Sequence, residues 1–279
     1  MNKKHKFKYI YIEITNSCNL KCPFCPSATL SNRQFMNIEQ FQQVIDNIKD
    51  YTKIVYLHIL GEPLLHPLFK DFLRICKEAN LEVRLTTNGS YLLSEAANIV
   101  EPISKINISL QSLINYSKDR QQAFLEELTE FIHLIKQRLV DKSLAIDFRL
   151  WNDKNDVTTL KLNEMLRNYL SENIMNLDLA GLRISEADEF IWPDLSMPIN
   201  QSTSICLGGK TQMGILVDGT VVLCCLDYLG ESNLGNIFHQ SMEEILDSSK
   251  YQKIMEGFMA KQCYLPICKR CLYRDRFLK

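Results

Sequence analysis

Short apolar runs alternate with segments of helical periodicity along the first two thirds of the chain. Residues 53–60 (KIVYLHIL) form a mostly apolar run of strand length, whereas residues 37–50 carry apolar side chains at a helical spacing. By these criteria, strands are predicted at 9–14, 53–60, 81–87, 105–110, 144–151 and 174–179, and helices at 37–50, 66–80, 94–100, 120–139 and 157–170. Strands joined through helices pair in parallel with right-handed crossovers. Since six strands are too few for a closed eight-stranded barrel, we expect an α/β fold, a partial (β/α)6 TIM-like barrel.

The alternation ends near residue 183, and a different pattern follows. Residues 183–204 lack a clear period and contain two prolines, so we expect a connector there. A β-hairpin is predicted at 213–225, because Asp218-Gly219 is a strong turn signal, and a helix is predicted at 241–257. The sequence therefore predicts a barrel over residues 1–182, a connector over 183–204 and a small C-terminal α+β domain containing the hairpin over 205–279.

Composition and charge are those of an ordinary globular protein. The chain has 279 residues, of which 46% are hydrophobic, and a formal net charge of −1. A nearly neutral chain has no electrostatic basis for binding nucleic acid or an anionic membrane, so we expect neither as a partner. No apolar run approaches the roughly 20 residues that a transmembrane helix needs. Residues 9–14 are too short for the core of a signal peptide, and we therefore expect a cytoplasmic protein.

Cysteine is the residue that changes this picture. The chain has ten cysteines, and three of them, Cys18, Cys22 and Cys25, follow the first predicted strand at the spacing Cys-x3-Cys-x2-Cys. An odd number of thiols in so short a loop is unsuited to a disulfide and suits a soft metal centre. The spacing favours an iron–sulfur cluster with one open iron. The alternatives are a zinc site that lacks its fourth ligand and chance clustering.

The three-cysteine motif, with the aromatic Phe24 directly before Cys25, resembles that of the radical S-adenosylmethionine superfamily. The resemblance implies that Cys18, Cys22 and Cys25 hold a [4Fe–4S] cluster and that Phe24 lies on the cofactor side. It implies that the open iron binds the amino and carboxylate groups of S-adenosylmethionine. The reduced cluster would then cleave this cofactor to methionine and a 5'-deoxyadenosyl radical, which abstracts a hydrogen atom from a substrate. A flavodoxin or ferredoxin is implied as the reductant.

A second group of cysteines offers four thiolates, which is the full ligand set for one closed [4Fe–4S] cluster: Cys206, Cys224, Cys268 and Cys271. A zinc ribbon is the alternative. The group resembles the shortened SPASM extension called a twitch domain, which holds one auxiliary [4Fe–4S] cluster. Cys225 and Cys263 do not fit its spacing. They are interpreted as packed thiols, alternative ligands or hydrogen donors to a substrate radical.

Gly61 and Glu62, at the end of the second predicted strand, are candidates for holding the cofactor. A carboxylate there can bind an ammonium group, and a glycine lets the backbone approach a ligand. A solvated turn glutamate is the alternative. Leu60-Gly61-Glu62-Pro63 resembles the Gly-Gly-Glu-Pro segment with which the family holds the amino group of S-adenosylmethionine, although Leu60 replaces the first glycine.

Three later strands provide further cofactor-side candidates. Ser109 and Gln111 end the fourth strand, where the family often has Ser-x-Asp in contact with the ribose or carboxylate of the cofactor, and Gln111 departs from that pattern. Asn88 resembles another cofactor-side position, although a plain turn explains it nearly as well. Arg149 lies within the fifth strand and is expected to point inward. Either the cofactor carboxylate or a structural ion pair would partner its charge.

The leading hypothesis is therefore a radical enzyme with two clusters. It would abstract a hydrogen atom from a small molecule and pass the resulting electron to the auxiliary cluster, which amounts to a two-electron, dehydrogenase-like oxidation. One alternative is modification or epimerisation of a ribosomal peptide. An alternative of another class is a non-catalytic iron–sulfur or zinc protein that acts in electron transfer or regulation. The sequence does not identify the substrate.

Overall fold

One nine-stranded sheet organises the protein. The computed structural model describes residues 7–99, 102–200 and 206–277, and its strand order is β6-β5-β4-β3-β2-β1-β7-β8-β9. The first six strands are parallel to one another. They are β1 (Tyr9–Ile12), β2 (Ile54–Tyr56), β3 (Glu82–Thr87), β4 (Ile103–Ser109), β5 (Ala145–Asn152) and β6 (Leu182–Asp188). The predicted partial (β/α)6 barrel is confirmed.

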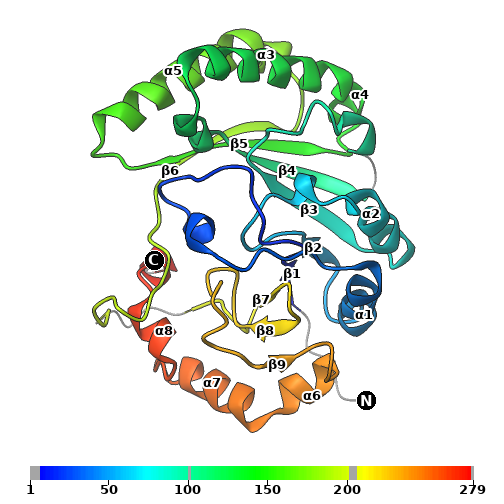
Figure 1. The fold of residues 1–279 in the computed structure, drawn as a ribbon, viewed down its shortest axis with the longest axis vertical. Coiled ribbons are helices and arrows are strands. Elements are labelled where there is room, and N and C mark those ends of the chain that lie inside the picture. The colour runs from blue at the N-terminus through cyan, green and yellow to red at the C-terminus, as the bar shows by residue number, and fades with distance from the viewer. Residues whose placement is uncertain (1–6, 100–101, 201–205, 278–279) are drawn as a thin grey trace.

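Helices cover the outer face of this parallel sheet (Figure 1). They are α1 (Ile38–Ile48), α2 (Phe69–Glu78), α3 (Lys118–Leu134), α4 (Lys136–Val140) and α5 (Val157–Asn173). Polar side chains cap the first backbone amides of three of them, with Asn37 before α1, Ser117 before α3 and Asp156 before α5. The buried rings of Phe41 and Phe72 stack between α1 and α2, with centroids 4.2 Å apart. No helix in the described ranges is long and apolar enough to cross a membrane.

The sixth strand differs from its prediction. Residues 174–179 do not form a strand; Ile174 is buried at the end of α5, Met175–Leu177 form a 3-10 turn, and Asp178 has a φ of 47°. The strand is instead β6, which occupies residues that the sequence assigns to the connector. It forms one edge of the sheet, and charged, exposed side chains interrupt its apolar positions. Such a strand lacks the continuous apolar run that marks the buried strands of a parallel sheet.

Several predicted helices are shorter or broken. Of the helix predicted at 94–100, residues 94–99 are described, and they contain the 3-10 segment Ala96–Asn98. The helix predicted at 120–139 breaks at Ile135. The helix predicted at 241–257 divides into α6 (Met242–Asp247) and α7 (Ser249–Met259). Ser248 causes this division, because its side chain accepts a hydrogen bond from the backbone of Tyr251 and so starts a new helix.

The C-terminal part of the chain extends the same sheet. β7 (Gln212–Ile215) pairs in parallel with β1, and β8 (Thr220–Val222) and β9 (Gly235–Asn236) follow as antiparallel neighbours. The predicted hairpin is therefore confirmed, whereas β9 and α8 (Pro266–Arg270) were not predicted. The sheet runs without interruption from the barrel strands into the hairpin, with α6, α7 and α8 along its far side (Figure 1).

A buried carboxylate fastens this junction. Glu13, directly after β1, is 3% exposed, and its two oxygens accept hydrogen bonds from the backbone amides of Leu60 (3.1 Å) and Val217 (3.2 Å). One side chain thus links the loop after β2 to the hairpin turn after β7. Burial raises the pKa of Glu13 to about 7, although both amide donors act in the opposite direction.

We predict that Glu13 makes stability depend on pH. Since folding raises this pKa from 4.5 to about 7, the folded state binds the proton more tightly. The resulting stabilisation is fully present below the unfolded-state pKa and is lost as pH rises through about 7. Relative to Glu13→Gln, the wild-type free energy of unfolding should fall by about 3 kcal/mol across that window. Chemical denaturation at a series of pH values measures this difference.

The exposed Glu243, on α6, provides the control for this measurement. Glu243→Gln should keep the pH dependence of the wild type, because an exposed carboxylate loses little solvation on folding. A constant difference between wild type and Glu13→Gln from pH 4.5 to 8 would contradict the prediction.

Candidate functional site

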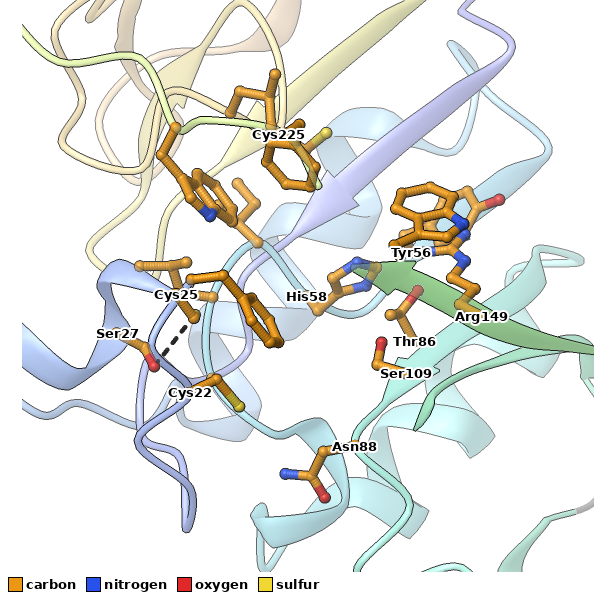
Figure 2. Close-up of a pocket in the computed structure, with 18 of the residues that line it drawn as sticks. Cys22, Cys25, Ser27, Tyr56, His58, Thr86, Asn88, Ser109, Arg149 and Cys225 are labelled. Carbon is orange, nitrogen blue, oxygen red and sulfur yellow. Dashed lines mark hydrogen bonds between the residues drawn. The ribbon is translucent and has the colours of Figure 1, made fainter. Parts of the chain in front are cut away.

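The carboxyl ends of the barrel strands surround a cavity of about 420 Å³. It gathers the first three cysteines and all seven residues predicted on the cofactor side, namely Phe24, Gly61, Glu62, Asn88, Ser109, Gln111 and Arg149. Figure 2 shows Cys22 and Cys25 on one side of this cavity and His58, Ser109 and Arg149 on the other. Residues far apart in the sequence meet here because parallel strands end at the same edge of the sheet.

The loop after β1 presents three thiols, each with a neighbouring hydrogen-bond partner. Asn115 Nδ2 donates to Cys22 Sγ (3.1 Å), the backbone amide of Leu20 donates to Cys18 Sγ (3.4 Å), and Cys25 Sγ lies 3.4 Å from Ser27 Oγ. Burial and the neighbouring Cys25 raise the pKa of Cys22 to about 12. A thiol in this setting needs a metal to deprotonate it, because the metal's charge favours the thiolate.

The thiols suit a cluster of several metal ions better than a single ion. Within the described ranges, no three His, Cys, Asp or Glu side chains converge closely enough to hold one metal ion. A mononuclear zinc site requires such convergence. Three soft thiolates on one loop are the donors that an iron–sulfur cluster uses. The residues present therefore fit the predicted [4Fe–4S] cluster.

Glu62 lies at the centre of this end of the sheet. Its carboxylate is 1% exposed and accepts hydrogen bonds from Leu64 N (3.1 Å), Thr87 Oγ1 (2.7 Å) and Asn88 N (2.7 Å). Burial raises the pKa of Glu62 to about 7. A solvated turn glutamate is thus excluded. Three donors leave the two oxygens with capacity for one more, as an ammonium ligand would require.

Gly61 has a clearer structural role than the one the sequence suggested. Its φ is 78°, and a Cβ atom there would lie 2.3 Å from the carbonyl oxygen of Thr15 and 2.8 Å from that of Ser17. The glycine therefore lets the backbone after β2 approach the cysteine loop, and the hydrogen bond from Glu62 N to Ser17 O (2.8 Å) joins them.

Asn88 and Gln111 use their amides differently. Asn88 Nδ2 donates to Asn19 Oδ1 (2.9 Å) and lies 3.8 Å from Cys18 Sγ, which links β3 to the cysteine loop. It therefore does more than form a plain turn. The Gln111 side chain is buried, and its Oε1 has no hydrogen-bond partner in the described chain. Such a buried acceptor at the rim of a cavity is available to a ligand.

A second, smaller cavity holds the other cysteine group. The four predicted auxiliary ligands line it together with a fifth thiol: Cys206, Cys224, Cys268, Cys271 and Cys263. Arg274 Nη1 donates to Cys263 Sγ (2.9 Å). Four or more soft thiols around one cavity fit an iron–sulfur cluster. The two spare cysteines are separated, because Cys225 lines the first cavity and Cys263 the second.

Some residues of the first cavity were not assigned a role from the sequence. Tyr11 stacks on Tyr56 with ring centroids 4.7 Å apart, and Trp151 lies beside the guanidinium of Arg149. Tyr11 lines this cavity together with Cys225. The signal that could have found them is the two-residue period of a strand, which places Trp151 on the same face as Arg149.

The sequence matches the models of two known families. The model of the radical SAM superfamily matches residues 12–157, and that of the SPASM iron–sulfur cluster-binding domain matches residues 206–272. The cofactor-modifying protein of tungsten-containing aldehyde ferredoxin oxidoreductase from Pyrococcus furiosus is 29% identical over 106 residues, which are 37% of this chain and 29% of that protein. The chain spans about half the length, or less, of the curated relatives that it matches first.

Solved structures share the whole fold at low identity. BtrN in complex with AdoMet and 2-DOIA superposes with a TM-score of 0.62 at 16% identity, over 95% of this chain and 93% of that one. Streptococcus suis SuiB bound to the precursor peptide SuiA gives 0.54 at 17% identity, over 98% of this chain and 73% of that one. At such identity these likenesses establish the fold alone.

We predict that Gly61→Ala is far more costly than an alanine at another glycine of positive φ. Gly230 is the control, because its φ is 76° but its Cβ would meet only side-chain atoms, at 3.3 Å or more. Gly230→Ala should cost about 1 kcal/mol of unfolding free energy, and Gly61→Ala at least about 2 kcal/mol more. Denaturant titration of both variants tests this, and equal losses would contradict the proposed close approach.

Proposed function

The chain belongs to the radical SAM superfamily, and from this we propose that it oxidises a small molecule by two electrons through hydrogen abstraction. Its cofactors are a [4Fe–4S] cluster with S-adenosylmethionine and, in the SPASM region, an auxiliary iron–sulfur cluster. One observation carries the proposal: the cysteine loop, Glu62 and Cys225 line a single cavity, while Cys224 lines the second one. A substrate in the first cavity would thus lie between the two cysteine groups.

Several residues of the first cavity are proposed to bind the cluster or S-adenosylmethionine. The bound cluster and S-adenosylmethionine supply a 5'-deoxyadenosyl radical. Cys18, Cys22 and Cys25 hold the cluster in this proposal, and Asn115 positions Cys22 through its hydrogen bond. Glu62 accepts the ammonium group of the cofactor with the acceptor capacity that its three donors leave.

Three further residues are proposed to orient the cofactor. Ser109 and Gln111 offer hydroxyl and amide groups to its ribose or carboxylate, and Phe24 provides an aromatic surface. Asn88 acts through Asn19 and Cys18, so it positions the loop. The reductant in this proposal is a flavodoxin or ferredoxin.

The size and lining of the first cavity support a small substrate. Its volume of about 420 Å³ lies in the range of small-molecule sites. Among the proteins that share the fold, one is bound to 2-DOIA and another to a precursor peptide. A peptide substrate is the alternative within the same enzyme class.

Cys225 supports a second candidate function, a redox-neutral epimerisation. Its side chain lines the cavity in which the substrate would bind. In this reaction the C–H bond of the substrate breaks, and the substrate radical takes a hydrogen atom from the Cys225 S–H. The resulting thiyl then needs one electron from the reductant and one proton to become a thiol again.

The iron content should distinguish the two cysteine groups. Anaerobically reconstituted wild type should hold about eight irons and should cleave S-adenosylmethionine under dithionite. A Cys18→Ala, Cys22→Ala, Cys25→Ala triple variant should retain about four irons and lose cleavage, because the second group remains intact. Four irons in the wild type would remove the auxiliary acceptor, and absence of cleavage by the fully loaded wild type would contradict the proposed function.

Deuterium incorporation should separate oxidation from epimerisation. With a substrate that stimulates cofactor cleavage, epimerisation in D₂O should place one deuterium in the product, because the Cys225 thiol exchanges with solvent. Cys225→Ala should abolish this label while 5'-deoxyadenosine still forms. Cys76→Ala, which alters a buried thiol on α2 away from both cavities, should retain it. Product without deuterium in the wild type would exclude hydrogen return and favour oxidation.

A further inference from the structure

We infer that Arg149, His58 and Trp151 form a subsite for an oxyanion of the substrate, a carboxylate or phosphate, on the wall of the first cavity that faces Cys225. This inference rests on the proposed function, because it assigns the substrate's charge within the same cavity. Arg149 is the one Lys or Arg among the described residues that line the cavity. An anionic group there would be recognised by charge and by hydrogen-bond direction together.

Arg149 has no anionic partner within the described part of the chain. The nearest carboxylate along β5 belongs to Asp147, and it pairs with Arg183 (2.6 Å) and Lys105 (3.5 Å) instead. The Nε atom of Arg149 is buried without a hydrogen-bond partner, and its guanidinium lies 4.5 Å from the centre of the Trp151 ring. A guanidinium held in place by stacking, with its donors unused, is well suited to bind an oxyanion in a bidentate manner.

Two polar atoms near Arg149, His58 Nδ1 and Trp151 Nε1, are also buried without a hydrogen-bond partner in the described chain. Burial and the charge of Arg149 lower the pKa of His58 to about 3, so its imidazole is neutral. A buried polar group without a partner destabilises the folded protein unless a ligand supplies one. An oxyanion has several lone pairs, so one such group can accept from Arg149, from the indole N–H and from an imidazole N–H.

The position of Arg149 favours the substrate over the cofactor carboxylate. The guanidinium of Arg149 lies beside the Trp151 ring, and Tyr11 and Tyr56 line the same cavity. The surroundings of Cys18 and Cys22 are instead Glu62, Asn88 and Asn115. Figure 2 shows the same separation, with Arg149 beside His58 and Tyr56 and across the cavity from Cys22.

Aromatic side chains around the subsite indicate what kind of molecule would bear the anionic group. Tyr11 and Tyr56 stack on each other and both meet the His58 ring edge-on, with centroids 5.7 Å apart. Trp192 also lines the cavity. An apolar or aromatic body bearing one carboxylate or phosphate therefore matches this wall better than a polyhydroxylated or cationic molecule.

The test uses the anaerobically reconstituted holoenzyme with S-adenosylmethionine and three radiolabelled probes of similar shape in equilibrium dialysis. Phenylacetate and phenyl phosphate carry the anion, and phenylacetamide is the neutral match. The wild type should bind at least one anionic probe at least tenfold more tightly than the amide, and the better of the two identifies carboxylate or phosphate as the recognised group. Arg149→Met should abolish this preference.

Arg167→Met is the matched control, since it removes the same charge from the exposed face of α5 and should keep the preference. Circular dichroism and the iron content of the reconstituted variant check that Arg149→Met is folded. Equal binding of all three probes by the wild type would overturn the inference. So would loss of S-adenosylmethionine binding in Arg149→Met, because Arg149 would then serve the cofactor. Failure of the wild type to cleave S-adenosylmethionine would refute the proposed function itself.

Discussion

The parallel pairing of β7 with β1 is the constraint on which the arrangement of both cysteine groups depends. It aligns Tyr9–Ile12 with Gln212–Ile215, so the two strands end at the same edge of the sheet. β1 leads there into the first cysteine loop, and β7 leads through the hairpin to Cys224. Glu13 binds backbone amides from both sides of this junction. The remote second cysteine group is thereby brought to the edge of the sheet where the first one lies.

Among the described residues, the chain satisfies some of the ionisable side chains of the interior and leaves others with an unpaired polar atom. Glu13 and Glu62 accept two and three hydrogen bonds, and these bonds hold loops against strands. Arg149 is stacked on an indole but lacks an anion among the described residues. A protein keeps such an unpaired cation only where another component supplies the partner, since its desolvation is otherwise costly. The contrast separates structural charges from a charge that faces a ligand.

The sequence predicted the parts of the fold that carry strong local signals. Strands such as β4 and β5 carry buried apolar side chains at Ile106, Ile108, Ile146 and Phe148, and they were placed within about two residues. The edge strand β6 carries no such run, and the apolar residues at 174–179 pack against α5 instead. Likewise, the break at Ser248 depends on a single capping hydrogen bond, which the spacing of apolar residues does not predict.

Motif spacing likewise found the cysteines and the residues that follow the strands, because these positions depend only on where a strand ends. The sequence already places His58 among several strand-end polar residues that could face a substrate. Choosing it over the others and joining it with Trp151 requires knowledge of which face of each strand turns inward. The different locations of Cys225 and Cys263 depend on how the tail from α7 to α8 folds back, which no local pattern encodes.

Cys224 and Cys225 are consecutive residues, yet one lines each cavity. The two cavities therefore adjoin along this stretch of backbone, where successive Cα atoms lie about 3.8 Å apart. This arrangement makes the sequence intolerant of a change in length at this point, because a single inserted or deleted residue would move the thiol of one cavity toward the other. The length of this segment is therefore under tighter constraint than the identity of the residues around it.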